Sequence, residues 1–73
     1  MTLRDCPVGM AARLVGVELD PGRVLRLREL GLALGTVVRV THRAAFGGRV
    51  VAVGPARFAV DAGTARSLRV EVV

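Results

Sequence analysis

Glycine and proline interrupt this chain so often that only short secondary-structure elements fit between them. The segments between these turns are rich in valine and leucine, several of them alternate apolar with polar residues, and they follow one another at spacings of roughly 8 to 12 residues. This pattern is typical of a small, partly closed β-barrel. The predicted strands are residues 10–19, 36–43, 49–53, 57–61 and 68–72. Because the chain has 73 residues, we expect one domain, residues 1–73.

One short α-helix is predicted between the first two strands. The Asp20 side chain can accept hydrogen bonds from the free amides of a first helical turn, and Pro21 suits the first helical position because it has no N–H to lose. The helix runs to about Leu30, and Gly31 supplies the left-handed conformation that ends it, with Leu32 folding back on the last turn. The apolar stripe expected to face the core consists of Val24, Leu27 and Leu30. A second, single helical turn is predicted over residues 62–67.

Alternation along the strands predicts which side chains point inward. The strand residues expected in the core are Val38, Val40, Phe58, Val60, Leu68, Val70 and Val72. Residues 10–19 are apolar on both faces, so this strand is expected to lie between the barrel interior and a covering element. Cys6 has no second cysteine to pair with, which agrees with a reducing compartment, and we expect it to be a small buried apolar residue.

All eleven basic residues are arginine, and the net charge is +5. A GC-rich codon bias and selection for binding nucleic acid both explain this composition, so a basic module that binds nucleic acid stays open as an alternative function. Against it, Phe46 and Phe58 are the only aromatic residues, too few for the stacking surfaces of single-strand binders. No apolar run is long enough to span a membrane and residues 1–5 contain no signal-peptide core, so we expect a cytoplasmic protein.

Residues that carry catalytic or metal chemistry are few and scattered. Cys6, His42, Met10 and the six carboxylates do not occur at the paired spacings of metal ligands. Ser67 has no histidine near it in the sequence, and no pair of acids lies in an apolar segment. We therefore expect a protein that is not an enzyme and that holds neither a metal nor a cofactor.

What remains is a contact surface, for which the sequence offers two segments. The first is the helix, where charged residues surround Leu25, a leucine outside the apolar stripe. Its candidate partner-binding residues are Arg23, Leu25, Arg26, Arg28 and Glu29. The alternative is that Leu25 packs under a strand and the arginines are merely solvated.

The second segment is the loop between the predicted strands 36–43 and 49–53. Arg43 and Arg49 flank this loop and Phe46 lies at its tip, a combination typical of interaction hot spots. The alternative is that Phe46 folds back and caps the barrel. A third possibility for the whole domain is self-association through edge strands or exposed valines, which would give a homo-oligomer.

Four stretches of the chain resemble the FeoA family of bacterial ferrous-iron uptake. Residues 27–38, Leu-Arg-Glu-Leu-Gly-Leu-Ala-Leu-Gly-Thr-Val-Val, are similar to the family signature Leu-x-x-Leu-Gly-Leu-x-Pro-Gly-Thr-x-Val. Residues 7–18 resemble its opening Pro-Gly-x-x-Ala-Arg-Ile-Val-Gly-Ile-Glu, with Val8 inserted, and residues 43–49 resemble its Arg-Ala-Pro-Leu-Gly-Asp-Pro loop. Residues 57–60 and 68–71 are similar to its last two strands.

The resemblance implies an SH3-like, five-stranded, partly open β-barrel with one short helix after the first strand. It also implies an accessory or regulatory role through contact with the membrane ferrous-iron transporter FeoB, whose cytosolic GTP-binding domain is the expected partner. The same barrel is found as the C-terminal domain of iron-dependent repressors, which keeps a self-associating regulatory domain open. Leu34, Ala45 and Gly48-Arg49 replace family residues that include prolines, so we expect looser loops at these positions.

Overall fold

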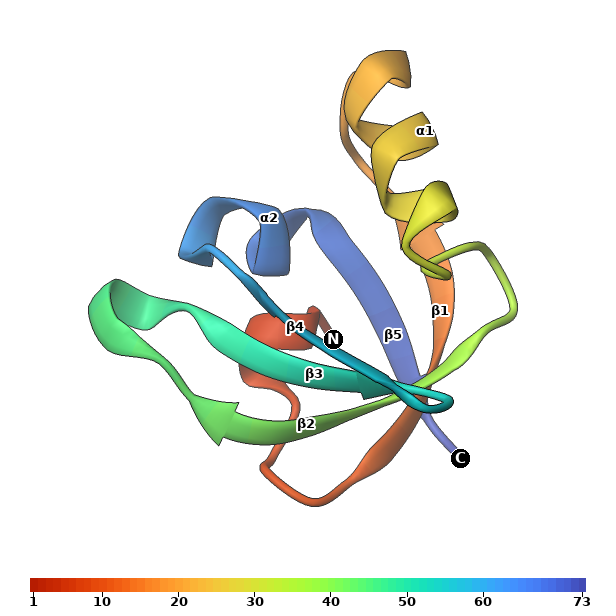
Figure 1. Ribbon diagram of the computed structural model, residues 1–73. Coiled ribbons are helices and arrows are strands. Elements are labelled where there is room, and N and C mark those ends of the chain that lie inside the picture. Colours follow the sequence, from red (N-terminus) through yellow and green to blue (C-terminus); the bar gives the residue numbers. More distant parts are fainter.

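The computed structural model describes residues 1–73 and shows five antiparallel strands in one sheet, in the order β4-β3-β2-β1-β5. The sheet curls into a partly open barrel (Figure 1), so the fold expected from the spacing of the turns is confirmed. The strands are β1 (Ala11–Val17), β2 (Val37–Arg43), β3 (Arg49–Val53), β4 (Ala56–Val60) and β5 (Leu68–Val72). The helices are α1 (Pro21–Glu29) and α2 (Ala62–Ser67), with 3₁₀ turns η1 (Leu3–Asp5) and η2 (Ala45–Gly47).

Strand β1 holds the two halves of the sheet together. It pairs with β2 on one side, where Ala12 faces Val38, and with β5 on the other, where Leu14 faces Val70. A register shift between Leu14 and Gly16 bends β1 along its β5 side. The strands at the two ends of the sheet, β4 and β5, are joined by α2, which crosses the gap that the open barrel leaves between them.

The core consists of thirteen buried residues, all apolar. Val38, Val40, Val60, Leu68 and Val70 are buried as predicted, and Phe58 packs against the core while partly exposed. The prediction for Val72 is wrong, because β5 ends at this residue, where nothing covers the rim of the barrel, and its side chain is 42% exposed.

The N-terminal segment contributes to the core in a way that no sequence pattern indicated. Turn η1 packs against α2 and β5, and its Leu3 is only 1% exposed. Cys6 follows it and is buried, as predicted, and burial raises the pKa of its thiol. A leucine in a segment of only three helical residues thus closes one end of the barrel.

Helix α1 begins and ends as its sequence predicts. The Asp20 carboxylate accepts a hydrogen bond from the Arg23 backbone N–H at 3.1 Å, and Gly31 has a φ of +99°. Leu32 folds back, donating its backbone N–H to the Leu27 carbonyl at 2.8 Å. No helix of the structure is long and apolar enough to cross a membrane.

The predicted apolar stripe of α1 is only partly correct. Leu27 is buried and Val24 is half-buried, but Leu30 is 47% exposed. The reason is visible in Figure 1, where α1 stands out from the barrel instead of lying along it. One leucine, Leu27, therefore anchors the helix in the core.

We predict that Leu3→Ala lowers the free energy of unfolding by about 2–4 kcal/mol, because it leaves a cavity in the core. Leu34→Ala is the matched control, since Leu34 is 67% exposed, and its expected effect is below about 0.5 kcal/mol. Urea unfolding followed by circular dichroism measures both. Equal stabilities for the two variants would show that η1 does not belong to the core.

Candidate docking surface

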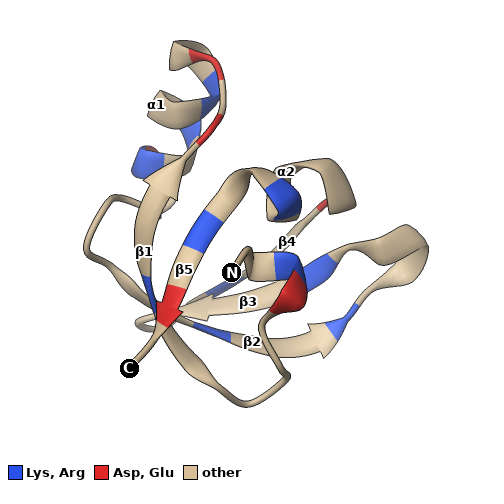
Figure 2. Ribbon diagram, turned by 180° about the vertical axis from the view of Figure 1, so that it is seen from behind, with Lys and Arg blue, Asp and Glu red and all other residues tan.

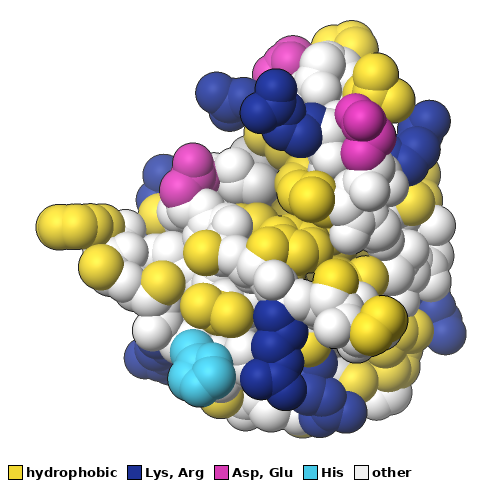
Figure 3. Space-filling view, in the orientation of Figure 1, with side chains coloured by type: hydrophobic (Ala, Val, Ile, Leu, Met, Phe, Trp, Pro, Cys, Tyr) yellow, Lys and Arg dark blue, Asp and Glu magenta, His cyan; other side chains and the backbone are white.

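Helix α1 presents apolar and charged side chains together on a part of the molecule that projects into solvent. Leu25 is 55% exposed, so the alternative in which it packs under a strand is wrong. Arg26, Arg28 and Glu29 are exposed as well. Figure 2 shows basic positions along α1 and acidic positions at its ends, and Figure 3 shows hydrophobic side chains among the charged ones. The five residues expected on this segment thus lie on one projecting helix.

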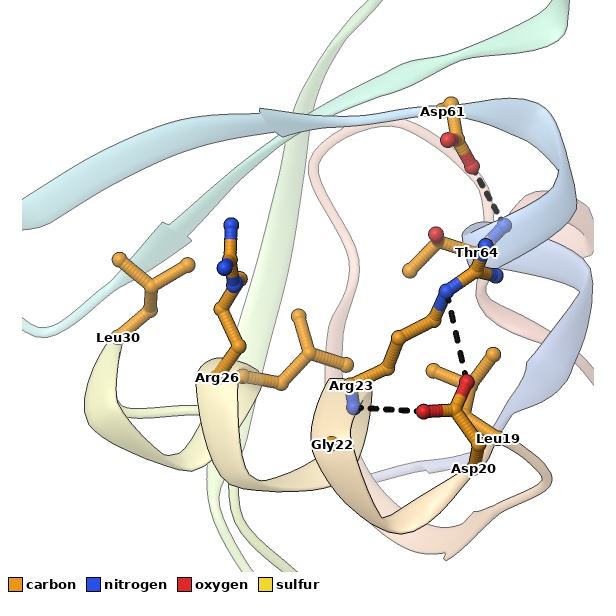
Figure 4. A pocket seen from close by; sticks show the side chains of 9 residues that line it. Leu19, Asp20, Gly22, Arg23, Arg26, Leu30, Asp61 and Thr64 are labelled. Carbon is orange, nitrogen blue, oxygen red and sulfur yellow. Dashed lines mark hydrogen bonds and ion pairs between the residues drawn. The ribbon is translucent and has the colours of Figure 1, made fainter.

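A groove of about 520 Å³ separates α1 from α2. We call it the α1–α2 groove, and its lining residues are Leu19, Asp20, Gly22, Arg23, Arg26, Leu27, Leu30, Asp61 and Thr64. Its leucines form an apolar floor, and Figure 4 shows that the Arg26 side chain extends into it. The two residues from α2, Asp61 and Thr64, lie across the groove from α1, and sequence reasoning did not identify them as part of a surface.

The two arginines of this groove differ in their electrostatic surroundings. Arg23 Nε lies 3.5 Å from Asp20 Oδ1, and its charge also acts on Asp61. The pKa of Asp61 is lowered, mainly because its carboxylate accepts the Thr64 backbone N–H at 2.6 Å. Arg26 has no ion-pair or hydrogen-bond partner, so its guanidinium is free to bind an anionic group from outside.

A second groove, of about 430 Å³, lies on the other side of α1 and runs along β1. Its lining residues are Val15, Gly16, Val17, Val24, Arg28, Leu32, Ala33 and Leu34. This β1–α1 groove explains why β1 is apolar on both faces. One face, with Ala12 and Leu14, is buried in the barrel, and the other forms the floor of an open groove that α1 covers only in part.

The loop between β2 and β3 displays its aromatic residue outward. Phe46 is 99% exposed, so the alternative in which it caps the barrel is wrong. Its φ of +57° lies in the left-handed region, which an aromatic residue rarely adopts. Arg43 is exposed at the end of β2.

Arg49 has a structural role in this loop. Its guanidinium donates to the carbonyls of Gly47 at 3.0 Å and Gly48 at 2.8 Å, and it reaches the Arg4 carbonyl at 3.0 Å. These bonds tie the loop to the N-terminal segment. Arg49 is half-buried, and its guanidinium makes three hydrogen bonds to backbone carbonyls of the same chain.

The two predicted segments do not form one continuous surface. In Figure 1 the β2–β3 loop lies at one extremity of the molecule and α1 at another, with α2 and the strands between them. The helix residues and the loop residues are therefore two separate candidate sites.

The structure brings no catalytic or metal-binding constellation together. No three His, Cys, Asp or Glu side chains gather in one place. His42 Nδ1 lies 3.0 Å from the hydroxyl of its neighbour Thr41, on the exposed face of β2. Neither groove contains a histidine, a cysteine or a serine.

We predict that Arg49→Ala lowers the free energy of unfolding by about 1.5–3 kcal/mol, because three carbonyl groups lose a charged donor. Arg43→Ala removes the same charge from an exposed side chain and should change stability by less than about 0.5 kcal/mol. Thermal and urea unfolding of both variants measure the difference. A loss for Arg43→Ala as large as that for Arg49→Ala would contradict the structural role of Arg49.

Comparison with known proteins places this arrangement in context. A family model described as "FeoA domain" matches residues 1–72. Among curated protein sequences no match was found. The crystal structure of Stenotrophomonas maltophilia FeoA complexed with zinc, described as an SH3 domain protein, is similar with 33% identity and a TM-score of 0.77. The similarity covers 97% of this chain and 89% of that one.

Two further structures are similar in fold at lower identity. Iron(II) transport protein A from Clostridium thermocellum has 24% identity and a TM-score of 0.90, and the match covers 100% of this chain but 46% of that one. A manganese-dependent transcriptional repressor has 21% identity and a TM-score of 0.86, with 100% of this chain matching 41% of the repressor. The chain therefore spans less than half of either protein.

Proposed function

Because this chain belongs to the FeoA family, which is linked to ferrous iron transport, we propose that it is a non-enzymatic regulator of a FeoB-type ferrous-iron transporter. It acts by direct contact with the transporter's cytosolic GTP-binding domain. The family is not a known enzyme family, and for the Stenotrophomonas relative a role as an activating factor of ferrous iron transport has been suggested.

The observation that carries this proposal is the exposure of Leu25 on a helix that projects from the barrel. A leucine that is 55% exposed, among arginines and a glutamate, combines an apolar anchor with a charged rim. The barrel core includes only one side chain of α1, Leu27, so the helix has most of its surface left for a partner.

The charges around Leu25 support a partner with an apolar side chain and carboxylates on its contact surface. The α1–α2 groove carries the unpaired Arg26 on one side of the helix, and the β1–α1 groove carries Arg28 on the other. A partner that packs an apolar side chain against Leu25 and places carboxylates toward these two arginines would match the charges on both sides. Such a contact weakens as salt concentration rises, because both arginines are exposed.

We predict that Leu25→Ser weakens binding to the purified GTP-binding domain at least tenfold, because truncating an interface anchor costs more than about 1.4 kcal/mol. Val8→Ser is the control, since Val8 is 49% exposed and lies in the turn before β1, away from α1. Isothermal titration calorimetry, with and without guanine nucleotide, measures both variants.

Two results would count against the proposal. The first is the absence of association between the unmodified chain and the domain at high micromolar concentration in either nucleotide state. The second is an equal affinity of Leu25→Ser and Val8→Ser, which would place the contact elsewhere.

A further inference from the structure

One continuous half of the chain has no acidic residue. Between Glu29 and Asp61, residues 30–60 contain four arginines and one histidine but neither aspartate nor glutamate. This segment forms β2, η2, β3 and β4. In Figure 3 the acidic side chains lie in the upper part of the molecule, over α1 and α2. The charged side chains visible in the lower part are all basic. Strands β2, β3 and β4 themselves carry no acidic position, whereas Glu71 lies in β5 and Asp5 in η1 (Figure 2).

Two of the four arginines of this half, Arg39 and Arg57, lie on the outer surface of the sheet. Arg39 of β2 faces Ala52 of β3, which in turn faces Arg57 of β4, so the two arginines lie in one row, two strands apart. That spacing is about 10 Å. Both are exposed, because their neighbours Val38, Val40 and Val51 point into the core. Arg39 donates a hydrogen bond to the Gly9 carbonyl, and Arg57 has no partner.

The β2–β3 loop adds Phe46 at its tip and the exposed Arg43 at the end of β2, where Arg43 faces Arg49 and so lies outside the row of Arg39 and Arg57. Hydrogen bonds from the Ala44 N–H to the Gly48 carbonyl at 2.9 Å and from the Gly48 N–H to the Ala45 carbonyl at 3.1 Å close the loop. The Arg49 guanidinium also holds the loop by donating hydrogen bonds to the Gly47 and Gly48 carbonyls. The loop thus holds Phe46 outward in a left-handed conformation that costs free energy, so its exposure is built into the fold.

We propose that this surface, formed by Arg39, Arg43, Phe46 and Arg57, binds the anionic surface of a lipid bilayer. The arginines contact lipid phosphates, and the Phe46 ring inserts among the headgroups. The inference goes beyond the proposed function and does not depend on it, because it uses no residue of α1. Docking through the β2–β3–β4 half leaves α1, which projects from another part of the molecule, free for a protein partner.

Charge complementarity alone would also fit a nucleic acid, but the side chains on this surface favour lipid. Phe46 is its one exposed phenylalanine, since Phe58 points toward the core, and His42 adds a single exposed imidazole. The outer positions next to the two arginines are mostly small and aliphatic, namely Val50, Ala52 and Ala59, with the exposed His42 opposite Val50. Such a surface has no platform on which successive bases could stack.

The test is co-sedimentation of the full chain with vesicles made of equal parts phosphatidylglycerol and phosphatidylcholine, with pure phosphatidylcholine vesicles as the reference. We expect binding to the anionic vesicles only, and its loss at high salt. Each arginine near an anionic surface contributes about fivefold to the partition coefficient, so Arg43→Gln combined with Arg57→Gln should reduce it about 25-fold. Phe46→Ser should reduce it about tenfold.

The matched control is Arg26→Gln combined with Arg28→Gln, which changes the net charge equally but on α1. This variant should keep most of the vesicle binding. Circular dichroism checks that every variant is folded, which is expected because all these side chains are exposed.

Three results would overturn the proposal. They are no binding to the anionic vesicles, equal losses in the two double-arginine variants, or displacement from the vesicles by an oligonucleotide at equal phosphate concentration. The last result would assign the surface to nucleic acid. None of them bears on the contact between α1 and the GTP-binding domain, so the two proposals fail separately.

Discussion

Strand β1 is hydrogen-bonded to a neighbouring strand on each side, and these two pairings hold the sheet together. It joins β2 to β5 and brings Leu14 into contact with a core of valines and leucines supplied by four other strands and by Leu3. The β-strands, α2 and η1 supply most of the core side chains. Helix α1 therefore contributes only Leu27 to the core. The helix is consequently free to project, and its leucines and arginines are available at the surface. The 73 residues thus form both a hydrophobic core and a helix whose surface is largely exposed.

Sequence reasoning predicted the features that depend on local chemistry. The strands follow from alternation and from turn residues, and both ends of α1 follow from Asp20 and Gly31, because capping needs only neighbouring atoms. It failed where exposure depends on tertiary arrangement. Leu30 continues the stripe of Leu27 by spacing, but the projection of α1 leaves it in solvent. Leu3 lies in a segment without periodicity, and only packing against α2 and β5 explains its burial.

The candidate surfaces show the same division. The sequence identified Leu25 and Phe46 as residues of interest but left their exposure open, because each could equally have packed against the barrel. The structure decides both questions, and it also shows that the two residues lie on separate surfaces. Arg49 looked like its neighbour Arg43 in the sequence, and only its three carbonyl contacts distinguish a structural arginine from an exposed one.

We propose that α1, which projects from the barrel, is the part of the molecule that contacts a protein partner. Backbone amide NMR spectra of the isotope-labelled chain, recorded as the GTP-binding domain of a FeoB-type transporter is added, locate this contact. We expect shift changes to concentrate in residues 15–34, which include α1 and the β1 residues on the floor of the β1–α1 groove, while amides of β2, β3 and β4 stay unchanged. Changes centred on the β2–β3 hairpin, or spread through the barrel core, would contradict it.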